Sequence, residues 1–351
     1  MSGHSKLCLI PVDQQHLWDE YITASPSGHL LQSWGWGELK ASAGWHPLRL
    51  ALWDTQQKQI VAVAQVLRRT PLHLPPGMGH LAYIPKGPVL DCSSGDAPGL
   101  FRTFFSQLHT NLVKHGALAL QTEFACEDEN PESKLLIREL DAMNFQRVQA
   151  IQPGRTIVID ITPDEDALLA HMKEKCRYNI RLASRKGVQV RLAETVEDVE
   201  SWYELLQTTS MRDRFGIHTL EYYRRAWQIF TPRKQARLLL AQYNGQLLAG
   251  IFVGLIAKQA MYLYGASSNE HRQLMPNYLL QWEAIRWAKQ AGATTYDFWG
   301  IPETDDQTEA MAGVYRFKSG WGGRIVRFMG NFEYVYHPVA MRLIRKVIEH
   351  Q

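Results

Sequence analysis

The chain has 351 residues, 45% apolar and 21% charged, a composition typical of a globular protein long enough for two domains. Its formal net charge of +3 gives no indication of a nucleic-acid-binding protein from bulk charge alone, so any basic surface has to be local. No apolar run approaches the ~20 residues of a membrane span, and polar residues interrupt the apolar segment near the N-terminus. We therefore expect a cytoplasmic protein without stable membrane insertion.

The cysteines and histidines give no sign of a disulfide framework or a metal site. The four cysteines are widely and irregularly spaced, with no CxxC pair: Cys8, Cys92, Cys126 and Cys176. Among the scattered histidines, His109 and His115 come nearest to a ligand spacing, and surface or packing roles are the expectation for both. We predict no metal and no cofactor.

In the first half of the chain, helical periodicity alternates with strand-like runs. The expected helices cover residues 13–24, 33–43, 99–115 and 131–143, the first with Asp13 as its N-cap. The expected strands cover residues 48–53, 60–68, 80–84 and 118–123, the first two joined as a hairpin. Residues 86–99 are rich in Gly, Pro, Ser and Asp and are expected to form a loop.

The second half repeats this order of elements. A hairpin of residues 237–243 and 246–256 turns at Asn244-Gly245, followed by a strand at 261–266, a helix at 277–290 and a strand at 294–299. In both halves a Gly-Ala pair separates the helix from the last strand, and an acid lies near that strand's end, Glu123 or Asp297. The recurrence indicates an internal duplication. The alternative is that two unrelated α/β domains share this order by chance.

The order of elements resembles the GNAT acyltransferase fold, in which the fourth and fifth strands splay apart to admit the acyl donor. We therefore predict an α/β protein of two tandem GNAT-like domains without a coiled-coil arm. Residues 1–153 would form the first domain, joined by a C-terminal helix within 331–351. Residues 154–330 would form the second.

Neither half carries the glycine loop with which such enzymes bind coenzyme A. That loop places backbone N–H groups and a helix N-terminus against the pyrophosphate. The corresponding segment of the second half, SSNEHRQLMPNYLL, contains no glycine, and that of the first, KGPVLDCSSGDAPGL, lacks the Arg or Gln of the motif. Coenzyme A is therefore not expected as donor.

One segment concentrates positive charge. Arg177, Arg181 and Arg185 recur every four residues and align along one helix face, where like charges disfavour the helix. This pattern is typical of an anionic partner such as an RNA backbone. A solvated basic face paired with acids elsewhere in the fold explains it equally well.

Other candidate residues have two interpretations each. Arg214 either binds phosphate or pairs with Asp213 on the surface. Tyr262 and Tyr264 are expected on one strand face, as core or rim packing residues. Lys318 either caps its helix or reaches the donor. Trp36 and Lys40 share a helix face, either as a stacking wall with a phosphate-binding amine or as a buried Trp with a snorkelling Lys.

Taken together, the motifs resemble the FemABX family of aminoacyl-tRNA-dependent peptidyltransferases, in that family's order over most of the chain. They are SGHLLQSWGWGELK, AYIPKGPV, KCRYNIRLASRKGV, MRDRFGI, YLYGASS, TYDFWGIPE and VYRFKSGWGG. The resemblance implies transfer of an amino acid from aminoacyl-tRNA to the side-chain amine of residue three of the peptidoglycan stem peptide. The acceptor would be a UDP-MurNAc-pentapeptide or its lipid-linked form. The chain looks like the compact, FemX-like type. This implies a monomer whose association with a membrane, where it occurs, is peripheral.

The resemblance also assigns roles to residues. Lys40 and Arg214 match positions that bind the acceptor's diphosphate, and Tyr262 matches an aromatic position that lines the substrate channel. Trp36, on the same helix face as Lys40, is a further substrate-binding candidate. Phe317 and Lys318 match a pair that holds the terminal ribose of the tRNA, and Glu123 lies where an acid approaches the acceptor amine. The tRNA would contact the basic helix through Lys173, Lys175, Arg177, Arg181, Arg185 and Lys186.

The reaction implied by this resemblance is aminolysis of an ester. Its main demands are positioning of two reactants, proton loss from the amine and stabilisation of an oxyanion. Two alternatives remain from the sequence: an aminoacyl-tRNA–protein transferase, and a non-catalytic tRNA- or nucleotide-binding relic of the fold.

Overall fold

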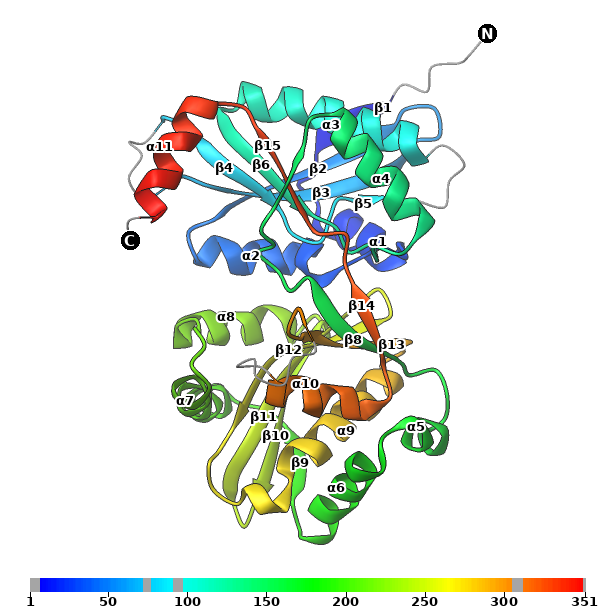
Figure 1. The fold of residues 1–351 in the computed structure, drawn as a ribbon, viewed down its shortest axis with the longest axis vertical. Coiled ribbons are helices and arrows are strands. Elements are labelled where there is room, and N and C mark those ends of the chain that lie inside the picture. The colour runs from blue at the N-terminus through cyan, green and yellow to red at the C-terminus, as the bar shows by residue number, and fades with distance from the viewer. Residues whose placement is uncertain (1–6, 72–76, 91–96, 305–311, 350–351) are drawn as a thin grey trace. The chain divides into compact units, whose positions relative to one another are not determined.

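The computed structural model describes residues 7–71, 77–90, 97–304 and 312–349, so Cys92 and part of the predicted loop at 86–99 lie outside the described residues. The chain forms two compact units, each built around one mixed sheet (Figure 1). Unit 1 comprises residues 1–154 and 327–351, and unit 2 comprises residues 155–326.

Unit 1 contains the sheet β1-β2-β3-β4-β6-β15-β7, with β5 paired to β3. Its strands are β1 (Leu7–Pro11), β2 (His46–Asp54), β3 (Gln59–Arg69), β4 (His80–Ile84), β5 (Val89–Leu90), β6 (Ala117–Glu123), β7 (Gln146–Val148) and β15 (Asn331–Val335). Its helices are α1 (Gln15–Ala24), η1 (Leu30–Gln32), α2 (Trp34–Ser42), α3 (Ala97–Lys114), α4 (Pro131–Ala142) and α11 (Pro338–Glu349).

Unit 2 contains the sheet β14-β8-β13-β12-β11-β10-β9. Its strands are β8 (Arg155–Asp160), β9 (Gln189–Leu192), β10 (Ala236–Tyr243), β11 (Gln246–Ile256), β12 (Gln259–Ser267), β13 (Thr295–Gly300) and β14 (Arg324–Arg327). Its helices are α5 (Glu165–His171), α6 (Glu174–Arg185), α7 (Val196–Asp213), α8 (Leu220–Phe230), η2 (Arg272–Leu274), α9 (Pro276–Gln290), α10 (Ala312–Lys318) and η3 (Ser319–Trp321).

The two sheets have the same topology, as the predicted duplication requires. In unit 1, β2, β3 and β4 pair antiparallel and β6 joins β4 in parallel; in unit 2, β10, β11, β12 and β13 repeat this pattern. The next strand in each sheet is antiparallel and comes from a distant part of the chain: β15 follows β6, and β8 follows β13. Strand β15 thus joins unit 1 from the part of the chain that follows unit 2, whereas β8 is the first strand of unit 2. No local pattern predicts either pairing.

Local signals explain most element boundaries. Asn244 and Gly245 have φ angles of 51° and 80°, the left-handed pair required by the tight turn between β10 and β11. The hydroxyl of Ser33 accepts a hydrogen bond from Trp36 N and caps α2, and Thr195 and Asp198 form a capping box at α7. The prediction for Asp13 is wrong, because Gln14 is the N-cap of α1 and makes no side-chain cap.

Each sheet buries a core on the faces that its helices cover. In unit 1, α3 and α4 pack through Phe101, Phe105 and Leu136 on one face (Figure 1). On β6, Leu118 and Ala119 instead contact α11. In unit 2, α5, α6 and α9 cover the face that contains Val253, and Trp202 of α7 and Tyr223 of α8 pack with Phe252 and Tyr264 of the sheet. This layered packing holds the central strands of both units rigidly enough to position a site.

Candidate functional site

In unit 2 the parallel pairing of β12 with β13 ends early. Their register runs from Gln259 and Thr295 to Met261 and Asp297, although β12 continues to Ser267 and β13 to Gly300. A bulge in β12 lies just beyond, between the partners of Phe252 and Val253. The backbone of these two strands therefore separates at Asp297, where a GNAT-like fold is expected to splay.

Lys318, the last residue of α10, lies at this point. Its side chain is buried, with 7% of the residue exposed, and Nζ donates to Gly300 O at 2.7 Å and Trp299 O at 3.3 Å. Burial lowers the pKa of Lys318 to about 8, and the nearby negative charge of Asp297 opposes that shift. A buried amine whose pKa is close to neutral is a common feature of catalytic sites.

Asp297 shapes the backbone that receives the lysine. Its Oδ1 accepts a hydrogen bond from Trp299 N at 2.7 Å and from the hydroxyl of Thr156 on β8. Trp299 has a φ of 60°, a left-handed conformation that costs energy for a bulky side chain. The carboxylate thus holds a strained turn whose carbonyl groups face Lys318.

Tyr262 completes this group, which we call the lysine site: Thr156, Tyr262, Asp297, Trp299 and Lys318. The Lys318 amine lies 5.5 Å from the centre of the Tyr262 ring, a cation–π distance. Burial raises the pKa of Tyr262 to about 12, so its hydroxyl stays protonated at neutral pH. The tyrosine folds back along β12 over Gly265, where any Cβ would collide with the ring.

The prediction that Tyr262 and Tyr264 share one strand face is wrong. Tyr262 pairs with Val253 and Tyr264 with Phe252, and these neighbours on β11 point to opposite faces. The bulge places one extra residue between the two tyrosines and reverses the alternation. Tyr264 therefore packs against Tyr223 and Phe252, away from Lys318.

Phe317 points into the core of unit 2. Its ring lies 5.1 Å from that of Tyr278 and 5.9 Å from that of Trp321, measured between centroids. This aromatic cluster fixes the end of α10 and thereby the position of Lys318.

In unit 1 the acid at the end of β6, Glu123, has different surroundings from Asp297. The parallel pairing of β4 with β6 continues to Ile84 and Thr122, and Gly87 N donates to Glu123 O at 2.8 Å. The carboxylate is buried, with 3% of the residue exposed. It accepts from Tyr83 Oη at 2.5 Å, Ile151 N at 2.5 Å and Gln152 N at 3.0 Å. Burial and the charge of Glu123 raise the pKa of Tyr83 above its usual range.

Trp36 and Lys40 of α2 lie together, as their spacing predicts. The Lys40 amine is 4.9 Å from the centre of the Trp36 ring, and Trp36 is buried. Burial lowers the pKa of Lys40 to about 8, so it is a cation at neutral pH held against an aromatic face.

Arg214 caps α7 in unit 2 and is exposed. Asp213 pairs with Arg212, through two contacts of 2.9 Å, so the predicted alternative of an Arg214–Asp213 pair does not form. Arg214 has a φ of 56°, at a C-terminal position that usually favours glycine. A charged residue that tolerates this conformation is consistent with a binding role.

The basic segment forms α6, with Lys173 as its N-cap residue. The guanidinium of Arg177 points to the end of α5, where it donates to the carbonyl groups of Met172, Ala170 and Leu169. The other basic residues are exposed: Lys173, Lys175, Arg181, Arg185 and Lys186. Arg177 is therefore a capping residue, and the remaining residues form the basic surface of α6.

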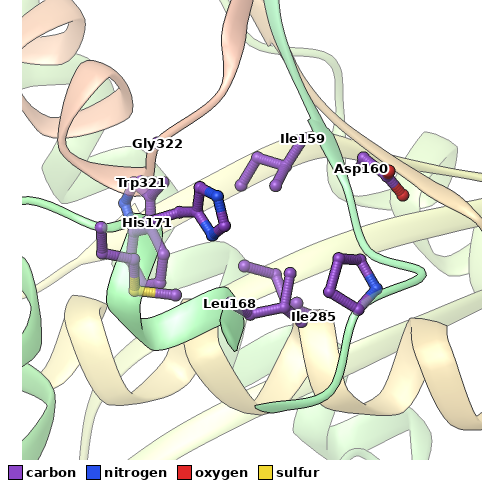
Figure 2. A pocket seen from close by; sticks show the side chains of 9 residues that line it. Ile159, Asp160, Leu168, His171, Ile285, Trp321 and Gly322 are labelled. Atoms are coloured by element: carbon purple, nitrogen blue, oxygen red, sulfur yellow. The ribbon is translucent and has the colours of Figure 1, made fainter. Parts of the chain in front are cut away.

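Two hollows in unit 2 lie near this helix. An open groove of about 820 Å³ between α6 and α9 is lined by Arg181, Arg185 and Tyr178 together with Glu174 and Glu283. Figure 2 shows the other, of about 140 Å³, where Leu168, Ile285 and Ile159 surround a space beside His171. The second is smaller than the hundreds of Å³ that a drug-sized ligand fills, so of these two hollows the α6–α9 groove is the one with room for a substrate group.

The backbone connects α6 to the lysine site. Lys173 N donates to Gly320 O at 2.9 Å, and the Lys173 amine lies 3.4 Å from Ser319 Oγ. Residues 319–321 directly follow Lys318. The N-terminal end of α6 is therefore bonded to the segment that follows the buried lysine.

Sequence reasoning alone did not assign roles to three residues of these sites. The sequence marks Asp297 only as an acid near a strand end, and no local pattern marks Thr156 or Tyr83. Their roles depend on pairing between strands that are distant in the chain, β8 with β13 and β4 with β6. The recurrence of an acid in both halves was the available signal for Asp297.

Helix α9 begins without a phosphate-binding loop. It is preceded by Met275 in a left-handed conformation, and Pro276 at its first position removes one backbone N–H donor. None of the described helices is both long enough and apolar enough to cross a membrane.

Comparison with solved structures establishes the fold. The chain superposes on the crystal structure of FemX with a TM-score of 0.86, at 22% identity, over 96% of this chain and 99% of that one. A tandem GNAT protein from the clavulanic acid biosynthesis pathway aligns with a TM-score of 0.55 at 11% identity, over 94% and 98% of the chains. The prediction of two tandem GNAT-like domains is confirmed, and the described residues contain no coiled-coil arm.

Sequence comparison gives the family. A lipid II:glycine glycyltransferase of Staphylococcus saprophyticus is 25% identical over 404 aligned positions, covering 95% of this chain and 94% of that protein. One from Staphylococcus aureus is 25% identical over 409 positions, with the same coverage. Both are aminoacyltransferases, in agreement with the enzyme class predicted from the motifs. The profile of the FemAB family matches residues 14–246 and 243–348, and the chain therefore belongs to the FemAB family.

Proposed function

We propose that this protein transfers an amino acid from aminoacyl-tRNA to the side-chain amine of residue three of a peptidoglycan stem peptide, forming the interpeptide bridge. The observation that carries the proposal is the lysine site, where a buried cation lies at the point at which β12 and β13 separate. The named relatives, which use lipid II and glycine, support a lipid-linked acceptor and a small amino acid. An aminoacyl-tRNA donor implies that the reaction takes place in the cytoplasm.

In the proposed reaction the neutral acceptor amine attacks the ester carbonyl of the aminoacyl-tRNA. The C–O bond to the ribose breaks, an amide C–N bond forms, and the amine proton passes to the leaving ribose oxygen. Lys318 would supply positive charge where the tetrahedral intermediate carries its oxyanion. At neutral pH its lowered pKa of about 8 still leaves most of the amine protonated.

The remaining residues would bind and position the two substrates. Lys40 and Arg214 are the proposed diphosphate ligands, with Trp36 and Tyr262 as channel walls. Glu123 is the sequence-based candidate for accepting the amine proton. Its donors Tyr83, Ile151 N and Gln152 N favour a positioning role over direct proton transfer.

The tRNA would lie along the basic surface of α6. Lys175, Arg181, Arg185 and Lys186 are exposed there, and Lys173 connects the helix to the segment after Lys318. Phe317 would act indirectly, by holding the end of α10 through its contacts with Tyr278 and Trp321.

The test is an incubation of the full chain with tRNA charged with a labelled amino acid. The acceptors are a UDP-MurNAc-pentapeptide, its lipid-linked form and a protein with a free N-terminus, each supplied alone. Label on the muramyl peptide supports the proposal, and comparison of the two muramyl acceptors decides between the soluble and lipid-linked forms. Label on the protein alone would instead favour an aminoacyl-tRNA–protein transferase. Binding of tRNA without any transfer would favour a non-catalytic relic.

A further inference from the structure

Unit 1 exposes an apolar surface at α11. Met78, Val339 and Leu343 are 62%, 74% and 61% exposed, and all three line one open hollow of about 530 Å³. Single apolar side chains are common on protein surfaces, whereas a group that shares one hollow is typical of an interaction site. We call these three residues the α11 face.

The sequence of α11 has apolar residues on two sides. Met341 and Ile344 are buried and pack on Leu118 and Ala119 of β6, which fixes the helix on the sheet. Val339 and Leu343 are four residues apart and form a second stripe that remains exposed. A surface helix needs only the inner stripe for folding, so the outer one is available to a partner.

Positive charge flanks the outer stripe. Arg342 and Lys346 are exposed and also four residues apart, whereas Arg345 is bound to the buried carboxylate of Glu333. The basic groups thus lie on α11 itself, beside the exposed apolar stripe.

We propose that the α11 face docks on the surface of an anionic lipid bilayer. Val339, Leu343 and Met78 would enter the boundary between headgroups and acyl chains, with Arg342 and Lys346 at the lipid phosphates. A helix with an exposed apolar stripe flanked by lysine and arginine binds in this way, and each basic side chain near such a surface strengthens the binding.

The charges and the size of the patch favour lipid over a second copy of the chain. A two-fold contact through α11 would bring Arg342 and Lys346 of one copy against the same residues of the other. Three apolar side chains are also far fewer than the ~20 residues a side of a stable protein interface. An anionic bilayer neutralises the cations and needs no large complementary surface.

This docking does not depend on the proposed transferase activity and can be measured without it. It would hold the enzyme against a membrane reversibly, because a short helix with two exposed apolar residues binds weakly compared with a membrane-spanning segment. If the acceptor is lipid-linked, the same contact brings the enzyme to the surface that contains it.

The experiment is co-sedimentation of the purified full chain with phosphatidylglycerol–phosphatidylcholine vesicles and with phosphatidylcholine vesicles. We expect binding to the anionic vesicles and a decrease in that binding as salt rises. Val339→Asp with Leu343→Asp should lower the partition coefficient by about tenfold or more. Arg342→Glu with Lys346→Glu, which keeps the apolar stripe, should lower it to a similar extent.

Leu135→Asp is the matched control, because Leu135 is a 45% exposed apolar residue on α4 of the same unit. Its vesicle binding should equal that of the unchanged chain. The proposal is overturned if the native chain does not bind anionic vesicles, or if the control loses binding as strongly as the α11 variants. It is also overturned if sedimentation equilibrium shows a dimer that the Val339→Asp, Leu343→Asp chain no longer forms, since a second copy would then cover the face.

Discussion

Each unit has an acid on the strand that follows its Gly-Ala pair, and the two acids have different surroundings. Glu123 at the end of β6 is enclosed by Tyr83 and two backbone N–H groups, in a sheet whose central parallel pair stays closed. Asp297 on β13 lies where the corresponding pair separates, close to the Lys318 cation. In unit 1 the acid thus serves as structural support, whereas in unit 2 the acid lies beside a buried amine. The difference predicts that chemistry depends on unit 2 and that unit 1 mainly binds the acceptor.

The largest effect should follow from removal of the Lys318 charge. Lys318→Met is expected to lower turnover by about 10²–10³-fold with little change in acceptor affinity, since the cation acts on charge that develops during the reaction. Lys318→Arg is the control that keeps a charge. Single-turnover kinetics with charged tRNA would measure the change. Equal losses of turnover and affinity would contradict the role.

The same substitution should change stability in the opposite direction. Burial lowers the pKa of Lys318 to about 8, below the ~10.4 of a lysine in the unfolded chain. Below pH 8 the protonated lysine therefore destabilises the folded state, and this destabilisation decreases as the pH rises from 8 towards the unfolded pKa. Lys318→Met should therefore raise the free energy of unfolding at pH 7, on the order of 1–3 kcal/mol, and by less at pH 10.

Asp297→Asn should have the second-largest effect. The carboxylate favours the charged lysine, so its loss should lower the pKa of Lys318 further and move the alkaline decline of turnover to lower pH. We expect turnover at pH 8 to fall by about 10–100-fold. The measurement is a pH–rate profile. Asp160→Asn, at the other end of β8, is the control. If the alkaline decline of turnover in Asp297→Asn is not shifted, Asp297 does not influence the pKa of Lys318.

Arg214 tests whether unit 2 also contributes to binding of the acceptor. Arg214→Gly removes the charge and relieves the left-handed backbone, so acceptor affinity should fall by about tenfold while thermal stability rises. Arg214→Ala should lose the same affinity without the gain in stability. Titration with a UDP-linked muramyl peptide measures both variants. Unchanged affinity in both would remove Arg214 from the diphosphate site.

Within α6, two kinds of arginine should behave differently. Arg181→Ala with Arg185→Ala should weaken tRNA binding several-fold and reduce the slope of log affinity against log salt by about 0.7–0.9 per lost phosphate contact. Arg177→Ala should leave that slope unchanged and lower the free energy of unfolding by about 1–2 kcal/mol, because the end of α5 loses its cap. Salt-dependent binding and chemical denaturation distinguish these outcomes. Equal slopes for both variants would contradict the assignment of Arg177.

The sequence was sufficient for elements whose signals are local. Hairpins, long amphipathic helices and the order shared by the halves follow from periodicity and turns such as Asn244-Gly245. Short strands such as β5 and β15 contain too few residues to show alternation, and the places of β8 and β15 in their sheets depend on pairing with strands distant in the chain. The bulge that turns Tyr262 away from Tyr264 likewise depends on its partner strand.

The candidate site was predictable to a similar degree. The pairing of Trp36 with Lys40 follows from helical spacing, and the basic surface of α6 follows from a repeat of four. The catalytic role of Lys318 is implied by the family resemblance alone, because nothing local predicts that this lysine is buried. Its position beside Asp297 requires the irregular turn at Trp299, which exists only once β8 and β13 are paired.

Glu123→Gln should have the smallest effect on turnover, and it tests most directly whether the acids of the two units have different roles. An amide keeps one acceptor oxygen but presents an N–H group to a site where Tyr83 Oη, Ile151 N and Gln152 N all donate. We expect the free energy of unfolding to fall by about 1–3 kcal/mol, with turnover at saturating acceptor changed by less than about threefold. Chemical denaturation and steady-state kinetics on one preparation measure both. A loss of turnover as large as that of Asp297→Asn, with stability unchanged, would make Glu123 the proton acceptor and assign catalytic chemistry to both units.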